Sequence, residues 1–288
     1  PDSMRGAFLR FAFAFVGKSF GHTMKLALLG PGVMGRAIVS GLLDAGKIQA
    51  ADLVFYGPRL ENVAEMAAQM GATSAATPAQ AVQNADVVLL AVKPIKIAEA
   101  LEQLREVLAP SQLLVSVLAG VSTFHIESFF AAEIPVVRAM PNTPSLVGAG
   151  ATAFCGGAFA SSSHLETARE FFAALGEAVS VEERLMDAVT GVSGSGPAYV
   201  WMFIEALADG GVRAGLPRAL AQKLAAQTVF GAAKMMIETG QHPAALKDGV
   251  ASPGGTTIAA LHALEKGGFR GDVMDAVWAA TQRARELG

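Results

Sequence analysis

The sequence is poor in cysteine, charge and aromatic residues, and these shortages exclude several classes of protein. Its single cysteine, Cys155, cannot form an internal disulfide, which is typical of a reducing compartment, so we expect a cytoplasmic location. The five histidines show no ligand-like spacing with cysteine or carboxylates, so we expect no metal site. A net charge of −3 lacks the basic field on which nucleic-acid binding depends.

The chain is rich in apolar residues. They make up 52% of its 288 residues, against 16% charged residues, which excludes a disordered chain. This length predicts about two domains. Glu205 and Asp209 interrupt the run around Trp201, so we expect no membrane segment there.

Residues 1–23 differ from the rest of the chain. Arg5 and Arg10 precede an aromatic run from Phe11 to Phe15, but the apolar run Phe11–Val16 is too short for a signal-peptide core or a membrane span. Met24 directly precedes the first strong strand. We therefore expect the natural domain to begin at Met24 and residues 1–23 to be a leader or an added segment.

A glycine-rich loop follows the first expected strand, Lys25–Leu29. It reads Gly30-Pro31-Gly32-Val33-Met34-Gly35 and opens an apolar helix, Val33–Ala45, before a second strand, Asp52–Tyr56. In this context the first glycine makes a tight turn, the second admits a pyrophosphate, and the third packs helix against strand. The pattern predicts dinucleotide binding by Gly30, Gly32, Val33, Met34 and Gly35. The alternative is a glycine-rich turn in an α/β domain that binds nothing.

The turn after the second strand, Gly57-Pro58-Arg59, contains no carboxylate before Glu61. An acidic residue at this point would bind the ribose 2′-hydroxyl of NAD, whereas an arginine can pair with the 2′-phosphate of NADP. Gly57 and Arg59 therefore favour NADPH, with NADH as the second choice. A solvated surface arginine is the alternative reading.

Three further strands end in small or polar turns. The expected strands are Asp86–Val92, Leu113–Leu118 and Val136–Met140. Ligands bind open α/β sheets at the carboxyl ends of the strands, so these turns predict one shared crevice. Its expected lining residues are Ala91, Val92, Lys93, Pro94, Ala119, Gly120 and Asn142.

The strand pattern stops near Glu183. We expect an α/β Rossmann domain with a mostly parallel sheet at residues 24–182, and an all-α domain at residues 183–288. Several of its helices are apolar nearly all round, since Trp201, Met202, Phe203 and Ile204 are consecutive. A domain of this size cannot bury such helices alone, which predicts a homodimer interface.

The stretch Ser252-Pro253-Gly254-Gly255-Thr256-Thr257 stands where a late helix begins. Free N–H groups and the helix dipole at such a junction suit a small anion such as a carboxylate, and the hydroxyls can donate beside it. A glycine turn followed by a capped helix is the plainer reading.

Together these motifs give the chain a resemblance to the pyrroline-5-carboxylate reductase family. The resemblance covers Met24–Gly288, and its specific stretches are Gly191–Tyr199 and Asp248–Thr257. It implies a Rossmann domain, a helical dimerisation domain, a site between them, and reduction of 1-pyrroline-5-carboxylate to L-proline by NADPH or NADH. Higher oligomers of dimers are compatible with it. Gly35 stands where the family often has alanine.

The resemblance also implies roles for individual residues. Backbone N–H groups at Gly255, Thr256 and Thr257 would bind the substrate carboxylate, and the Thr257 hydroxyl would contact the imine nitrogen. Ser252 would shape the turn, while Ser193 or Ser195 would line the pocket. Two alternatives stay open: a β-hydroxyacid dehydrogenase-like enzyme with Lys223 or Lys234 as its base, and a non-enzymatic NADP-sensing protein.

Overall fold

The front half of the molecule is built on one eight-stranded sheet of order β3-β2-β1-β4-β5-β6-β7-β8. The structure is a computed structural model that describes residues 24–287, so the expectation for residues 1–23 lies outside the described residues. Every neighbouring pair is parallel except β6 and β7. The strands are β1 (Leu26–Leu29), β2 (Leu53–Tyr56), β3 (Thr73–Ser74), β4 (Val87–Leu90), β5 (Leu113–Ser116), β6 (Val136–Met140), β7 (Gly150–Gly156) and β8 (Gly176–Ser180).

Helices cover both faces of this sheet, which is why β1, β4 and β5 are buried along their whole length. One face packs against α1 (Val33–Asp44), α2 (Leu60–Gln69) and α6 (Ser162–Ala173). The other packs against α3 (Pro78–Val82), α4 (Ile97–Leu104) and α5 (Thr123–Glu127). The expected Rossmann fold with a mostly parallel sheet is confirmed.

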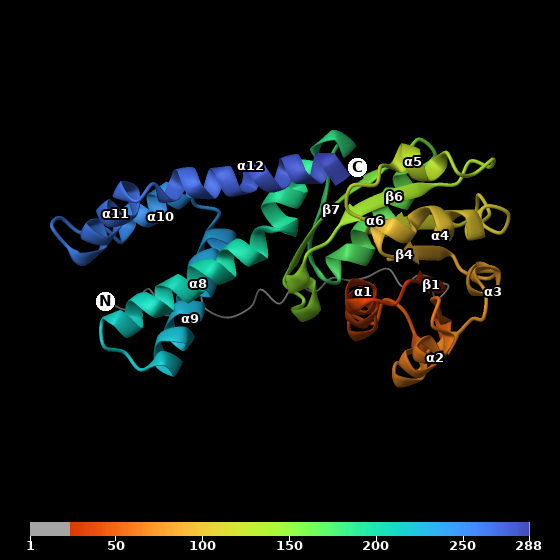
Figure 1. Cartoon of the computed structure of the whole chain (residues 1–288), viewed down its shortest axis with the longest axis horizontal. Coiled ribbons are helices and arrows are strands. Elements are labelled where there is room, and N and C mark those ends of the chain that lie inside the picture. Colours follow the sequence, from red (N-terminus) through yellow and green to blue (C-terminus); the bar gives the residue numbers. More distant parts are fainter. Residues whose placement is uncertain (1–23, 288) are drawn as a thin grey trace, which may run out of the picture.

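The back half is helical from Met186 onward and extends away from the sheet (Figure 1). Its elements are α7 (Met186–Val189), the π-helix η5 (Thr190–Gly194), α8 (Gly196–Arg213), α9 (Arg218–Thr239), α10 (Pro243–Gly249), α11 (Thr256–Lys266) and α12 (Phe269–Leu287). Gly240 ends α9 at φ +63° and donates to the Met236 carbonyl, the left-handed C-terminal position expected of it. Between residues 24 and 287, no helix combines the length and the apolarity that crossing a membrane requires.

The helical half buries very little of its own apolar surface. Within the described chain, α8 buries only Gly196 and Ala208, while α10 and α11 bury no residue. Trp201 is 55% exposed, Met202 74% and Ile237 78%. Such contiguous apolar exposure marks an interaction surface and agrees with the subunit interface expected from the sequence.

Candidate functional site

The glycine loop after β1 has the geometry its sequence predicts. Gly30 has φ +86°, and a Cβ on it would lie 2.9 Å from the Ala91 carbonyl carbon, so only glycine fits. A Cβ on Gly35 would lie 2.8 Å from Leu28 and 3.1 Å from the Ala91 methyl, which explains its place between helix and sheet. Ala91 directly follows β4 and occupies the space that side chains on Gly30 and Gly35 would otherwise take.

Gly32 opens α1 without obstructing its first turn. It is the N-cap, and no side chain of the described structure caps the helix there. A Cβ on Gly32 would meet nothing closer than the Gly30 carbonyl oxygen at 4.0 Å. Val33 is exposed and Met34 half-buried beside it. The Gly32 N–H donates to the Gly30 carbonyl at 2.7 Å, so the N–H groups of Val33 and Met34, with the helix dipole behind them, are the ones that can cradle a phosphate.

A small pocket opens at the ends of β1, β2 and β4. Gly30, Gly57 and Val92 contribute its backbone walls, and Gly57 is buried against Pro31 and Val63. Arg59, exposed, is the N-cap of α2 at the rim of this region. Sequence reasoning missed Lys96 and Gln103, which also line the pocket, because neither belongs to a recognisable motif.

The other predicted turns lie at the same carboxyl edge of the sheet. Lys93 is exposed after β4, and its carbonyl accepts from the N–H of Lys96 at 2.8 Å. Ala119 and Gly120 are half-buried after β5, with Gly120 at φ +76°. Asn142 is buried after β6, and its side-chain amide is engaged within the protein: Nδ2 donates to the Ser193 carbonyl and Oδ1 accepts from the Ala151 N–H.

The segment Ser193–Ser195 belongs to the π-helix η5 and its end, an element that sequence reasoning missed. The N–H of Ser195 donates to the Thr190 carbonyl at 2.8 Å, an i to i+5 bond. The Ser193 hydroxyl donates to the Val189 carbonyl at 3.1 Å, and both serines are half-buried. Single π-turns of this kind occur mostly at functional sites.

The Ser252–Thr257 turn presents a bare helix start. Gly254 has φ +65°, and Gly255 is the N-cap of α11, with no side-chain cap from the described residues. A Cβ on Gly255 would lie 2.2 Å from the Ser252 hydroxyl oxygen, so the Ser252 side chain packs directly against the N-cap glycine. The free N–H groups of the first turn and the half-buried Thr257 hydroxyl are available to an anion.

These two halves of the predicted site do not meet within one chain. The turn between α10 and α11 lies at the far end of the helical half, across the length of the molecule from α1 and β1 (Figure 1). A site that uses both features therefore needs the crevice of one protomer and the turn of another.

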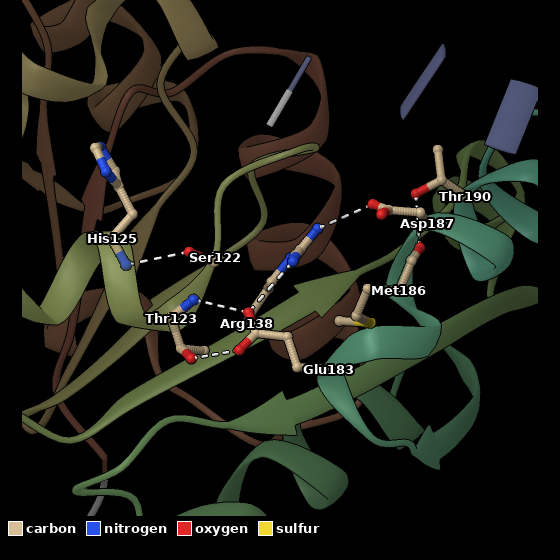
Figure 2. A network of polar contacts seen from close by, with 8 residues as sticks. All are labelled: Ser122, Thr123, His125, Arg138, Glu183, Met186, Asp187 and Thr190. Carbon is tan, nitrogen blue, oxygen red and sulfur yellow. Dashed lines mark hydrogen bonds and ion pairs between the residues drawn. The ribbon is translucent and has the colours of Figure 1, made fainter. Parts of the chain in front are cut away.

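A buried polar cluster joins the sheet to the start of the helical half (Figure 2). The Arg138 guanidinium, on β6, lies 3.2 Å from a Glu183 carboxylate oxygen and 3.8 Å from Asp187. The same Glu183 carboxylate accepts from the Thr123 N–H at 2.7 Å and from its hydroxyl at 2.6 Å. Glu183 thus links α5 and β6 to the 3-10 turn Glu183–Leu185, which leads into α7.

Cys155 lies opposite Arg138 on β7 and is a packing residue, as the sequence indicates. Burial, reinforced by the nearby Glu183 charge, raises the pKa of its thiol to about 12. A thiol held neutral in this way is no nucleophile at neutral pH. Lys223 and Lys234 are both exposed on α9, and Lys234 pairs with Glu238, so neither has the setting of a buried catalytic base. Across residues 24–287 no group of three potential metal ligands gathers.

Comparison with known proteins agrees with this geometry. Residues 183–287 match the family model for pyrroline-5-carboxylate reductase dimerisation, and residues 25–120 match that for coenzyme F420-dependent NADP oxidoreductase. The dimerisation match shows that the chain forms homo-oligomers through its helical half.

Full-length relatives give the same result. A pyrroline-5-carboxylate reductase from Synechocystis is 47% identical over 92% of this chain and 99% of its own. The solved reductase of Coxiella burnetii is 36% identical, with a TM-score of 0.87 over 93% of this chain and 99% of that one. That of Plasmodium falciparum, solved with NADP bound, is 34% identical, with a TM-score of 0.83 over 92% and 98%. The chain therefore belongs to the pyrroline-5-carboxylate reductase family.

Proposed function

We propose that this protein reduces 1-pyrroline-5-carboxylate to L-proline with NADPH, the last step of proline synthesis. The observation that carries the proposal is the pairing of two features in a member of this family. One is a dinucleotide crevice with no carboxylate at the ribose position, and the other is a bare helix start flanked by Ser252 and Thr257. We place the division between a cofactor domain and a helical substrate domain at residues 182 and 183, and the enzyme in the cytoplasm.

The crevice fits a nicotinamide dinucleotide. Gly30 leaves no side chain in the turn, and Gly32 leaves the first turn of α1 open, so the N–H groups of Val33 and Met34 can hold the pyrophosphate. Arg59 would hold the 2′-phosphate, and the turns at Lys93 and Gly120 would border the rest of the cofactor. When bound, the cofactor supplies the hydride; the protein supplies orientation.

The substrate is a five-membered cyclic imine with a carboxylate. N–H groups at Thr256 and Thr257 would bind that carboxylate at the start of α11, whereas the Gly255 N–H already donates to the Ser252 carbonyl at 3.0 Å. The Thr257 hydroxyl would donate to the imine nitrogen and polarise it, because a threonine is too weak an acid to protonate it outright at neutral pH. Ser193 and Ser195 would line the pocket from the π-helix of the other protomer.

The whole proposal is tested by following NADPH oxidation when 1-pyrroline-5-carboxylate is added to the purified oligomer. We expect stoichiometric formation of proline. Reduction of NADP⁺ on addition of 2- or 3-hydroxy acids would favour the β-hydroxyacid dehydrogenase alternative, and NADPH binding without turnover would favour the sensor.

Thr257→Ala tests the role of the hydroxyl. We expect kcat to fall about ten- to a hundredfold, because the imine nitrogen loses its donor while the backbone N–H groups stay in place. Thr257→Ser is the matched control, since it keeps the hydroxyl and should keep most of the rate. Unchanged turnover in a folded Thr257→Ala protein would remove Thr257 from the mechanism.

A further inference from the structure

At the junction between η5 and α8, the Ser193 carbonyl accepts no backbone hydrogen bond from the described residues that follow it. In a continuous helix the Ser193 carbonyl would accept a hydrogen bond from the N–H four residues on. That residue is Pro197, which has no N–H, and it stands in the first turn of α8. The Ser193 carbonyl therefore needs a donor from elsewhere in the protein.

Asn142 supplies that donor. Its Nδ2 donates to the Ser193 carbonyl oxygen at 3.1 Å, while its Oδ1 accepts from the Ala151 N–H at 2.9 Å. The side chain is only 7% exposed. The two partners fix the orientation of the amide, because the carbonyl can only accept and the N–H can only donate.

This amide ties the π-helix to the carboxyl edge of the sheet. Asn142 comes two residues after the end of β6, at the edge where the cofactor crevice lies. On the same strand end, the methyl of Met140 comes within 2.7 Å of where a Cβ on Gly194 would be, so η5 lies directly against β6. A second anchor, the pair of Arg138 with Glu183 and Asp187, holds the segment further upstream.

We propose that Asn142 is a positioning residue for the substrate pocket: by replacing the N–H that Pro197 lacks, it holds η5 so that Ser193 and Ser195 face the substrate. The proposal rests on the proposed function and assigns Asn142 an action through Ser193, in place of the cofactor contact predicted from its sequence position.

Asn142→Asp is the sharpest test, because the carboxylate still accepts from Ala151 but cannot donate to Ser193. In the full oligomer we expect the KM for 1-pyrroline-5-carboxylate to rise about tenfold, while the Kd for NADPH stays within about twofold. Asn84→Asp is the matched control: it makes the same exchange at an exposed residue between α3 and β4, at the opposite edge of the sheet, and should leave both constants within about twofold. A rise in the Kd for NADPH equal to the rise in KM would overturn the proposal and return Asn142 to the cofactor.

A second variant distinguishes two roles for Asn142: positioning η5, or only supplying a hydrogen-bond donor to the Ser193 carbonyl. Asn142→Asp combined with Pro197→Ala gives the Ser193 carbonyl a donor within the helix. We expect this double variant to regain the thermal stability of the unaltered protein. Its KM for 1-pyrroline-5-carboxylate should stay raised, because residue 142 still does not tie η5 to the end of β6. Recovery of KM as well would contradict a positioning role.

Amide hydrogen exchange reports the anchor without any substrate. Exchange across residues 190–197 should accelerate in Asn142→Asp and not in Asn84→Asp. Unchanged exchange would show that Asn142 does not anchor η5. If the unaltered protein formed no proline, the proposed function would be wrong, and the exchange measurement would still test the anchoring role of Asn142.

Discussion

The turn after β2 is where we expect a single side chain to set cofactor choice. Arg59 starts α2 at the rim of the crevice, with Gly57 buried behind it and no carboxylate before Glu61. The absence of an acid removes the usual partner of a ribose 2′-hydroxyl, and the guanidinium can make charge-assisted hydrogen bonds to a 2′-phosphate.

Replacing this arginine tests the assignment. Arg59→Ala should raise the KM for NADPH about tenfold or more and leave that for NADH nearly unchanged, since only NADPH carries the phosphate. Steady-state kinetics with both cofactors measure the difference. Equal changes in the KM values for NADPH and NADH would show that Arg59 neither binds the 2′-phosphate nor sets cofactor specificity.

Cys155 gives a second prediction at the residue scale, on pH. Its thiol pKa is raised from 9.0 to about 12 in the folded protein, so the folded state keeps a proton that the unfolded state loses. The resulting stability is fully present below pH 9.0 and is lost as the pH rises toward about 12. The free energy of unfolding can be measured by urea titration at several pH values from 8 to 10. We expect it to decline less steeply with rising pH in Cys155→Ser than in the unaltered chain. Parallel curves would contradict the assignment.

At the scale of elements, Glu183 links the helical half to the sheet. It is the shared acceptor for Arg138 and Thr123, and the Arg138 side chain is only 8% exposed. Removing the carboxylate would leave that guanidinium buried with only the more distant Asp187.

We expect Glu183→Ala to lower the free energy of unfolding by about 2 to 4 kcal/mol, less than for a fully buried pair because Glu183 itself is partly exposed. The neighbouring Glu182 forms an exposed pair with Arg184 and is the matched control; Glu182→Ala should change it by less than about 1 kcal/mol. Denaturant titration compares the two, and similar losses would mean that the cluster in Figure 2 does not hold the junction.

The elements also show what the sequence could predict. The first strand, the glycine loop and α1 were predictable because short-range chemistry fixes them: Gly30 needs a positive φ, and β1 is a continuous apolar run. The short helices α3 and α5 and the two-residue strand β3 carry too few apolar positions to show a period. The π-helix was hidden for another reason, since it depends on Asn142, which is 51 residues away from Ser193 in the sequence.

At the scale of the whole molecule, one chain does not bring together its glycine loop and its Ser252–Thr257 turn. The sequence indicated a crevice and an anion-binding turn from local patterns, and no local pattern says which copy of the chain completes a site. The structure supplies this by placing α10 and α11 at the far end of an apolar, exposed helical half (Figure 1). Homo-oligomerisation through that half is then part of the catalytic apparatus, and we expect its smallest active form to be a dimer.

Mixing two impaired variants tests whether the site is shared. Gly32→Asp should abolish cofactor binding without unfolding the chain: the position has open space and a φ of −75°, an aspartate caps a helix well, and its charge repels the pyrophosphate. Thr257→Ala supplies a protomer with an intact crevice and a defective turn.

When equal amounts of the two variants are unfolded and refolded together, about half of the dimers should be mixed. Each mixed dimer contains one site built from the intact crevice of one protomer and the intact turn of the other, and one site with both defects. The mixture should therefore regain about a quarter of the unaltered activity, above the sum of the two variants refolded apart. If each site were built within a single chain, every site would keep its own defect and no activity would return on mixing.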